Sequence, residues 1–224
     1  MTAPAPLPPV IAIDGPSASG KGTVAQRAAK ALGFHYLDSG ALYRLVAVAA
    51  KQAGVAWTDE AALAPIAANL DARFDGDEIY LNQVVATNLV RSEDASLGAS
   101  KVAVWPAVRA GLLARQKAFR TAPGLVADGR DMGSVVFPDA VVKIFLTADA
   151  ETRAERRYKQ LIGKGMGANM AALLQDIRAR DERDSQRSAA PLQKTDDAFL
   201  LDTTDLTIDA AVATVLARYK AVTK

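Results

Sequence analysis

The sequence predicts an α/β fold in which helices cover both faces of a parallel sheet. Short apolar runs alternate with helical segments over most of the chain, which is the pattern of strands joined by crossover helices. A glycine-rich segment, GPSASGKGT, lies between the first apolar run and the first helix at residues 15–23. A strand, a glycine loop, a lysine and a helix in this order typically enclose a polyphosphate.

The first quarter of the chain is expected to contain two strands and two helices. Four prolines in residues 1–9 predict a flexible, extended tail. Strands are expected at residues 10–13 and 34–37, and the first helix at 24–32. Ser39 is the expected N-cap of a helix that continues to about residue 52.

The middle of the chain interrupts this alternation with a small antiparallel insert. Residues 70–74 and 78–81 are expected to pair as a hairpin around a turn at 75–77. Residues 84–90 are a candidate third strand. Helices are expected at 94–104 and 106–119, separated by a break at Trp105-Pro106.

The last part of the chain returns to the alternation and contains a second insert. Strands are expected at residues 124–128, 141–146 and 198–202, and a closing helix at 208–219. Within 158–176 the glycines of IGKGMG interrupt two charged helices, which predicts a flexible lid. An ordinary helix–loop–helix excursion is the alternative.

These elements predict a division of the chain into a core, an insert and a lid. The expected parts are a tail at 1–9, core at 10–60, an insert at 61–105, core at 106–155, a lid with its flanking helices at 156–185, and core at 186–224.

The composition is that of an ordinary globular protein and excludes several classes of function. Of 224 residues, 50% are hydrophobic and 23% are charged, and the net charge of +2 provides no basic field for nucleic acid. The chain has no cysteine, which excludes disulfides and thiolate-bound zinc. No signal peptide or membrane-spanning run is recognisable, so we expect a cytoplasmic protein without nucleic-acid or membrane partners.

The glycine-rich loop is the strongest candidate site. Gly15 and Gly20 permit backbone angles that a Cβ would penalise, so the loop can point several N–H groups into one concavity. Lys21 adds a charge for the outer phosphates. Gly22 stands where the strict motif has Ser or Thr, which weakens the usual assignment of a hydroxyl ligand for Mg²⁺. The expected phosphate-binding residues are Gly15, Pro16, Ser17, Ala18, Ser19, Gly20, Lys21, Gly22 and Thr23.

Two polar clusters follow expected strands, at the sheet edge where ligands of such folds bind. The first contains Ser39, Tyr43 and Arg44, for which a helix cap and a solvated turn are the alternative. The second follows the strand at 124–128, where Asp128 occupies a position that holds Mg²⁺ in many phosphate-loop enzymes. Next to it, the planar fork of Arg130 suits a phosphate, although a turn with an internal ion pair is the alternative.

Arginines flank the predicted lid. Arg153, Arg156 and Arg157 share one helical face, while Arg180, Asp184 and Arg187 share another. Such arginines can neutralise the charge on a phosphoryl group in transfer, and a solvated, salt-bridged helix is the alternative.

Over nearly its whole length, the chain resembles a bacterial cytidylate kinase of the nucleoside monophosphate kinase group. The matching stretches, in the family's order, are IDGPSASGKGT, LDSGALYR, ADGRDMGSVVFPDA, VKIFL and RDERDSQRSAAPL. The resemblance implies a three-layer P-loop kinase fold with a parallel central sheet, a small antiparallel insert that binds the nucleoside monophosphate, and a helical lid. It also implies transfer of the γ-phosphoryl group of ATP to CMP or dCMP with Mg²⁺.

The resemblance also implies roles for individual residues. Ser39, Arg44 and Arg130 match the CMP side, and Arg187 matches a contact to its phosphate. Ser100, Arg109 and Asp131 match contacts to the cytosine edge, and Arg180 and Asp184 match ribose contacts. Tyr43 lies in the same motif as Ser39. Lys21, Arg130, Arg157 and Arg187 are the expected catalytic residues, although the sequence does not decide whether Arg156 or Arg157 faces ATP.

Three other functions remain open from the residues alone. A GTP-dependent switch would need an Asn-Lys-x-Asp motif, which the sequence lacks. A kinase for AMP, UMP or a small alcohol would keep the phosphate loop and change the acceptor. A nucleic-acid-binding ATPase is opposed by the near-neutral charge. The sequence does not identify the Mg²⁺ ligands, the preference among CMP, dCMP and UMP, or the extent of lid closure, and we expect a monomer because nothing demands an oligomer.

Overall fold

The computed structural model describes residues 7–75, 78–163 and 165–223, and it divides into two compact units. The first unit consists of Met1–Leu37, Ala118–Gln186 and Ala190–Lys224. The second consists of Asp38–Lys117 with Arg187–Ala189. The finer division into core, insert and lid stays a prediction.

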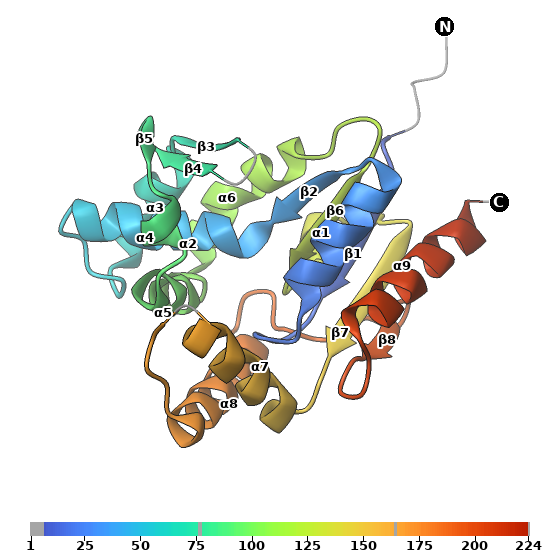
Figure 1. Cartoon of the computed structure of the whole chain (residues 1–224). Coiled ribbons are helices and arrows are strands. Elements are labelled where there is room, and N and C mark those ends of the chain that lie inside the picture. The colour runs from blue at the N-terminus through green and yellow to red at the C-terminus, as the bar shows by residue number, and fades with distance from the viewer. Residues whose placement is uncertain (1–6, 76–77, 164, 224) are drawn as a thin grey trace, which may run out of the picture. The chain divides into compact units, whose positions relative to one another are not determined.

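A five-stranded sheet forms the centre of the first unit. Its strand order is β2-β6-β1-β7-β8 (Figure 1). The strands are β1 (Val10–Asp14), β2 (His35–Asp38), β6 (Leu125–Gly129), β7 (Val142–Thr147) and β8 (Phe199–Asp202). β1 pairs in parallel with β6 and β7, and β7 pairs in parallel with β8. Every residue of β1 and β6 is buried, as expected for strands covered on both faces. The predicted fold class is confirmed.

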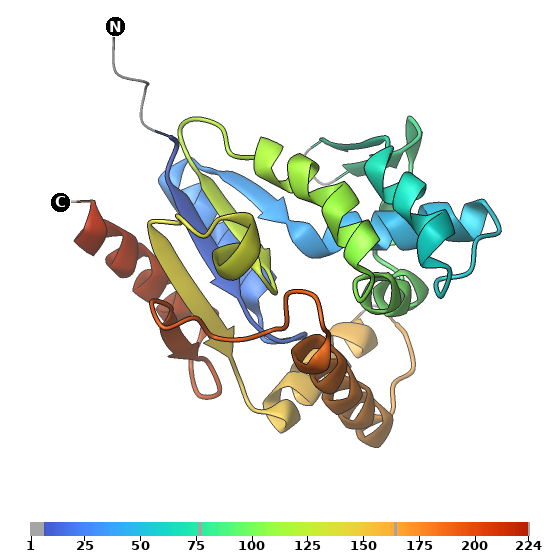
Figure 2. The same ribbon diagram turned by 180° about the vertical axis from the view of Figure 1, so that it is seen from behind.

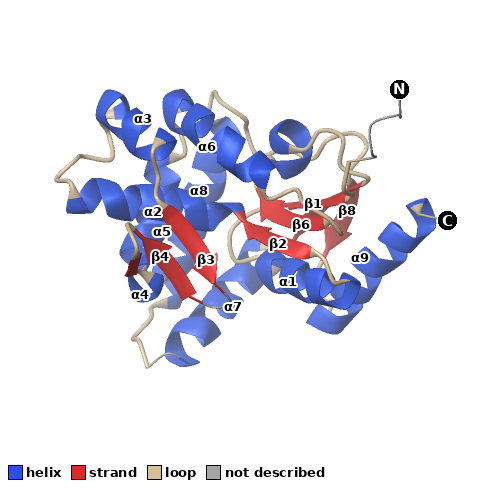
Figure 3. Ribbon diagram, turned by 90° about the horizontal axis from the view of Figure 1, so that it is seen from above, coloured by secondary structure: helices blue, strands red, loops and turns tan. Residues whose placement is uncertain are grey.

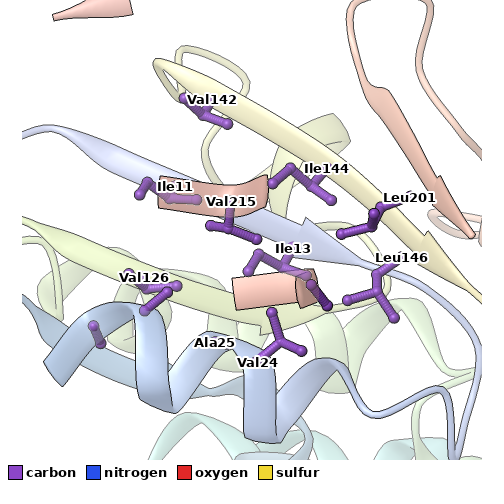
Figure 4. Packing of buried hydrophobic residues seen from close by; sticks show 13 residues of the cluster. Ile11, Ile13, Val24, Ala25, Val126, Val142, Ile144, Leu146, Leu201 and Val215 are labelled. Atoms are coloured by element: carbon purple, nitrogen blue, oxygen red, sulfur yellow. The ribbon is translucent and has the colours of Figure 1, made fainter. Parts of the chain in front are cut away.

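Two helices that are far apart in the sequence cover one face of this sheet. Helices α1 (Lys21–Leu32) and α9 (Ile208–Val222) contact each other and contribute Val24 and Val215 to the same core (Figure 4). That core also takes in Ile11 and Ile13 of β1 and Leu146 of β7, all of them buried. Alternating side chains of one strand point to opposite faces, so β1 has a second apolar face to cover.

The second face of the sheet is contacted by a π-helical turn, η1 (Met132–Val136), which packs on β1 and β6. In Figure 2 it lies on the side away from α1 and α9. Both oxygens of the Asp14 carboxylate accept backbone N–H groups at its start, from Met132 and Gly133, at 2.8 Å each. The sequence did not predict η1, because this turn depends on a carboxylate more than a hundred residues away in the chain.

Helices α7 (Ala150–Gly163) and α8 (Met170–Gln186) pack against each other in the first unit. They correspond to the two charged helices expected around the lid. The connection between them contains Gly165, whose φ of 72° is in the left-handed region that glycine adopts readily. Lys164, which belongs to the expected glycine-rich crossing, lies outside the described residues.

The second unit combines helices with a small antiparallel sheet (Figure 3). Helix α2 (Ser39–Gln52) packs against α5 (Glu93–Val102). The other elements are α3 (Glu60–Ala68), β3 (Ala72–Asp75), β4 (Glu78–Leu81), β5 (Val84–Val85), α4 (Thr87–Val90) and α6 (Pro106–Ala118). β4 pairs antiparallel with β3 and with β5, which confirms the predicted small antiparallel sheet.

Several expected element boundaries are wrong. The strand expected at 84–90 ends at Val85, because the chain then turns into α4 and the Thr87 hydroxyl accepts the N–H of Ile79 at 2.9 Å. The N-cap of α2 is Asp38 and not Ser39: the Asp38 carboxylate accepts the N–H of Ala41 at 3.1 Å. The sequence analysis did not predict α3, which holds a proline inside the helix.

Other expected features fall partly outside the described residues. Residues 1–6 of the predicted tail and residues 76–77 of the predicted hairpin turn are among them. Within the described part of the chain, no helix combines the length and the apolarity that a bilayer crossing requires.

Candidate functional site

The phosphate loop joins the end of β1 to the start of α1, as the sequence predicts. A Cβ on Gly15 would overlap the carbonyl oxygen of Leu146, so this position has room only for glycine. Gly20 is the N-cap of α1 with a φ of 89°, and the helix begins at Lys21, three residues earlier than expected. Ala18 also has a positive φ, 57°, which strains a residue that carries a Cβ.

Hydrogen bonds from cations and hydroxyls hold the carbonyl groups of this loop. Lys21 Nζ and Ser19 Oγ both donate to the carbonyl of Pro16, at 3.2 Å and 3.0 Å. Arg153 Nη1 donates to the carbonyl of Ser17 at 3.3 Å. The buried Ser17 hydroxyl has no hydrogen-bond partner within the described structure, so it suits an oxygen of a bound ligand.

The structure distinguishes between the two adjacent arginines of α7. Arg156 Nη1 donates to the carbonyl of Ser19 and to Thr203 Oγ1, at 3.1 Å each, and Nη2 donates to the Thr203 carbonyl. Arg157 Nη1 donates to Gln160 Oε1 on the same helix at 2.6 Å. Arg156 therefore contacts the phosphate loop in this conformation. The catalytic role expected for Arg157 stays a prediction.

Arg153 connects the phosphate loop with both helices of the expected lid. Its Nη1 and Nη2 donate to the two carboxylate oxygens of Asp181 on α8, at 3.0 Å and 2.6 Å. Its Nε donates to the carbonyl of Ala148 at 2.9 Å, and its side chain is 6% exposed. A two-pronged, mostly buried pair of this kind fixes orientation as well as position.

Arg130 and Asp184, which the sequence placed in separate motifs, form an ion pair in the first unit. Arg130 Nε donates to Asp184 Oδ2 at 2.7 Å, and the side chains are 15% and 8% exposed. Burial by itself would lower the pKa of Arg130, but Asp184, with Asp128 and Asp181 nearby, raises it above its ordinary value. Arg130 therefore stays charged and can hold an anionic group.

Asp14 is a buried carboxylate to which the sequence analysis gave no role. Burial raises its pKa to about 6, although the two backbone N–H groups of Met132 and Gly133 lower it. Asp131, the N-cap of η1, is also buried. Because Asp14 holds the first two residues of η1, it fixes the backbone next to Arg130 and Asp131.

The carboxylate of Asp128 at the end of β6 is the candidate for a divalent cation. Among the described residues, no group of three or more His, Cys, Asp or Glu side chains is arranged to hold a metal. Mg²⁺ in phosphate-transfer sites needs no such cage, since it keeps several waters and takes other ligands from the substrate phosphates. Asp128 is 4% exposed and lies on the strand next to β1, so one carboxylate at this place fits Mg²⁺.

Most of the remaining predicted residues belong to the second unit. Ser39 and Tyr43 are buried on α2, and Ser100 is buried on α5. The Arg109 guanidinium lies 5.6 Å from the centre of the Tyr43 ring, and its Nη1 donates to the carbonyl of Ala103 at 3.2 Å. Arg44 Nη1 donates to the carbonyl of Val90 at 3.3 Å. Within this unit, α2 thus brings Tyr43 to Arg109.

The last two predicted residues are Arg187 and Arg180. Arg187 belongs to the second unit and is buried. Arg180 is half-buried on α8 in the first unit.

Sequence reasoning missed three residues around the phosphate loop: Asp14, Tyr36 and Thr203. Asp14 had a usable signal, since a carboxylate between a buried strand and a glycine loop needs a partner. Tyr36 and Thr203 had none, because their contacts come from strand order. Thr203 Oγ1 donates to the carbonyl of Thr147 at 2.9 Å and lies 3.3 Å from the carbonyl of Ser19.

Comparisons with known proteins show the family to which the chain belongs. The family profile described as Cytidylate kinase matches residues 11–221. A cytidylate kinase of Chromobacterium violaceum is 62% identical over 208 residues, which cover 93% of this chain and 94% of that protein. A cytidylate kinase of Bordetella bronchiseptica is 56% identical over 221 residues and 99% of both chains.

Among solved structures, a gluconokinase from Sinorhizobium meliloti 1021 has a TM-score of 0.51 at 16% identity. The match covers 96% of this chain and 94% of the gluconokinase chain. At this identity it indicates only that the two proteins share a fold. The profile and the relatives cover nearly the whole chain. The chain belongs to the cytidylate kinase family.

Proposed function

We propose that the protein transfers the γ-phosphoryl group of ATP to CMP or dCMP, giving CDP or dCDP and ADP. The observation that carries this proposal is a phosphate loop whose carbonyls are held by Lys21, Arg153 and Arg156, in a chain of the cytidylate kinase family. With its carbonyls engaged in this way, the loop can present N–H groups to phosphate oxygens.

Catalysis by this chain consists of positioning and charge stabilisation. Phosphoryl transfer needs no covalent enzyme group, because the charge on the transferring group can be neutralised by cations and N–H donors. Residues 15–23, Lys21 among them, would bind the ATP phosphates. Arg156 would support this loop, and Arg157 is predicted to reach the reacting group. Bound Mg²⁺ would neutralise phosphate oxygens, and Asp128 would hold it directly or through water.

The proposed contacts to the acceptor nucleotide follow the motifs of the cytidylate kinase family. Ser39, Arg44 and Arg130 are proposed for the CMP side, and Arg187 for its phosphate. Ser100, Arg109 and Asp131 are proposed for the cytosine edge, and Arg180 and Asp184 for the ribose. The amino group of cytosine can donate a hydrogen bond to the Asp131 carboxylate. Uracil has the acceptor O4 at that place, which would repel the carboxylate. Tyr43 would support Arg109 through its ring.

The test is ADP formation from ATP and Mg²⁺ with CMP, dCMP, UMP, AMP or no acceptor, side by side. We expect fast turnover with CMP and dCMP and slower turnover with UMP. The matched inactive control is Lys21→Ala. Turnover only with AMP would leave the role of the phosphate loop intact and contradict the proposed acceptor. Slow hydrolysis that needs no acceptor would favour the alternative of a GTP-dependent switch. A monomeric state and a cytoplasmic location stay predictions, to be checked by sedimentation and by fractionation.

A further inference from the structure

Three groups from separate elements meet beside the first turn of α1. Tyr36 on β2 donates its phenolic hydroxyl to Asp128 Oδ2 at 2.8 Å. A Cβ built on Gly22 would lie 3.1 Å from the same oxygen and 3.5 Å from the Tyr36 hydroxyl. The space next to residue 22 is therefore occupied by the Tyr36–Asp128 hydrogen bond.

This arrangement explains the glycine at position 22 in physical terms. In the strict phosphate-loop motif, a Ser or Thr follows the lysine and its hydroxyl contacts Mg²⁺. At a distance of 3.1 Å, even the Cβ of such a residue would press on the Asp128 carboxylate. A hydroxyl is thus present at this site, but it is the phenolic hydroxyl of Tyr36. It donates a hydrogen bond to Asp128, the candidate metal ligand.

The ring of Tyr36 is held well enough to fix the position of its hydroxyl. Tyr36 is half-buried and packs against the hydrophobic core shared by β1, α1 and α9. A phenol has few rotatable bonds, so a packed ring places its oxygen with little freedom. The hydrogen bond to Oδ2 then sets the plane of the Asp128 carboxylate and the direction in which its other oxygen points.

We propose that Tyr36 is a positioning residue that orients Asp128 for the divalent cation of bound ATP, in place of a hydroxyl at residue 22. The inference rests on the proposed function, since it requires ATP and a cation as ligands. Residues that hydrogen-bond a metal ligand typically change metal affinity by about 10–100-fold when they are mutated. Tyr36 acts through Asp128, so its loss weakens cation binding without weakening contacts to the nucleotide itself.

The test compares Tyr36→Phe with Tyr219→Phe. Both substitutions remove one phenolic hydroxyl from a half-buried ring that packs against the same core. Tyr219 lies on α9, where its ring makes an edge contact with Phe34, so it provides a matched control. Urea unfolding of both variants shows whether the fold is retained.

The primary measurement is binding of Mn²⁺ to the complex with a non-hydrolysable ATP analogue, followed by electron paramagnetic resonance. Tyr36→Phe is expected to weaken Mn²⁺ binding about 10-fold. In EDTA, calorimetry is expected to find the affinity for the analogue unchanged in both variants. In kinetics, Tyr36→Phe raises the Mg²⁺ concentration needed for half-maximal rate, while kcat at saturating Mg²⁺ stays near that of the parent protein.

The outcomes distinguish this inference from the proposed function. Equal Mn²⁺ affinity in Tyr36→Phe and the parent protein overturns the role of Tyr36 and leaves the kinase proposal intact. If Mn²⁺ does not strengthen analogue binding even in the parent protein, the proposed function and this inference both fail. An equal loss in Tyr219→Phe shows a general effect on the core and also overturns the role of Tyr36.

Discussion

Arg130 and Asp184 are joined by a 2.7 Å hydrogen bond between Nε and Oδ2, which links the turn after β6 to helix α8. Both side chains are mostly buried, so each satisfies the charge of the other. The family resemblance implies that Arg130 contacts the CMP side and that Asp184 contacts the ribose. Because they are paired, we expect a substitution of one to change the surroundings of the other.

A double-mutant cycle of Arg130→Gln and Asp184→Asn is expected to be strongly non-additive. Each single substitution leaves a charged partner buried, which typically costs about 3–5 kcal/mol of stability, while the double variant should lose less than the sum. The measurement is urea unfolding of all four proteins. The control cycle uses the exposed pair Arg27–Asp209, whose coupling should be small. Equal coupling in both cycles would contradict a special role for burial at Arg130–Asp184.

Arg156 and Arg157 are neighbours in sequence with different contacts, so their alanine variants should have different kinetics. Arg156→Ala removes the donors to Ser19 and Thr203, and we expect the KM for ATP to rise about 10-fold because the loop loses its support. Arg157→Ala is expected to lower kcat and kcat/KM together, as for a group that acts in the transition state. If Arg157→Ala leaves kcat within about twofold, Arg157 is not a catalytic residue.

The raised pKa of Asp14 predicts a pH-dependent contribution to stability. The folded state holds the Asp14 proton up to about pH 6, while the unfolded state releases it near the ordinary value of 3.8. Between these values the folded state binds more protons, so stability from this group falls as pH rises. The full difference is about 3 kcal/mol, of which about 2 kcal/mol should appear between pH 4 and pH 7.

Asp14→Asn removes this titration and serves as the test. The free energy of unfolding of the variant minus that of the parent protein should rise by about 2 kcal/mol from pH 4 to pH 7, whatever its constant offset. Urea unfolding at several pH values gives the difference. If the difference does not change with pH, the pKa of Asp14 is ordinary. If the difference falls as pH rises, the N–H groups of Met132 and Gly133 lower the pKa of Asp14 by more than burial raises it.

Ala18 occupies a left-handed backbone conformation, with a φ of 57°. Ala18→Gly should therefore raise the free energy of unfolding by about 0.5–1 kcal/mol, because relief of strain exceeds the extra entropy of the unfolded chain. Ala213→Gly on the exposed side of α9 is the matched control and should lower stability by about 1 kcal/mol. Similar losses in both variants would show that Ala18 is not strained.

Asp131→Ala is expected to reduce the preference for CMP over UMP more than it reduces the rate with the better acceptor. The loss of a carboxylate that pairs with the cytosine amino group should lower the ratio of the two kcat/KM values by about 10-fold, which corresponds to 1.4 kcal/mol. Steady-state kinetics with both acceptors gives the ratio. An unchanged ratio would remove Asp131 from the base site.

The phosphate loop, the strands of the large sheet and most of the long helices could be predicted from local pattern. Gly15, Gly20 and Lys21 are recognisable because they belong to one motif of nine residues. The spacing of this motif between a buried strand and a helix suits phosphate binding. The strands of the sheet could be predicted because each one is a short apolar run. Some errors arose at the ends of elements, as at Val85 and Asp38, where a side-chain hydrogen bond lies at the boundary. Two whole elements, α3 and η1, were not predicted.

The sequence by itself determined the fold class, the phosphate loop and the membership of a family. Strand order was decided only by the tertiary structure, because pairing β1 with both β6 and β7 depends on long-range packing. That order brings Tyr36 to Asp128, Asp14 to Met132 and Arg153 to Ser17, contacts that span from 92 to 136 residues of the chain. No local pattern encodes contacts between residues so far apart in the sequence. The groups that hold the site in place could therefore be identified only in the folded chain.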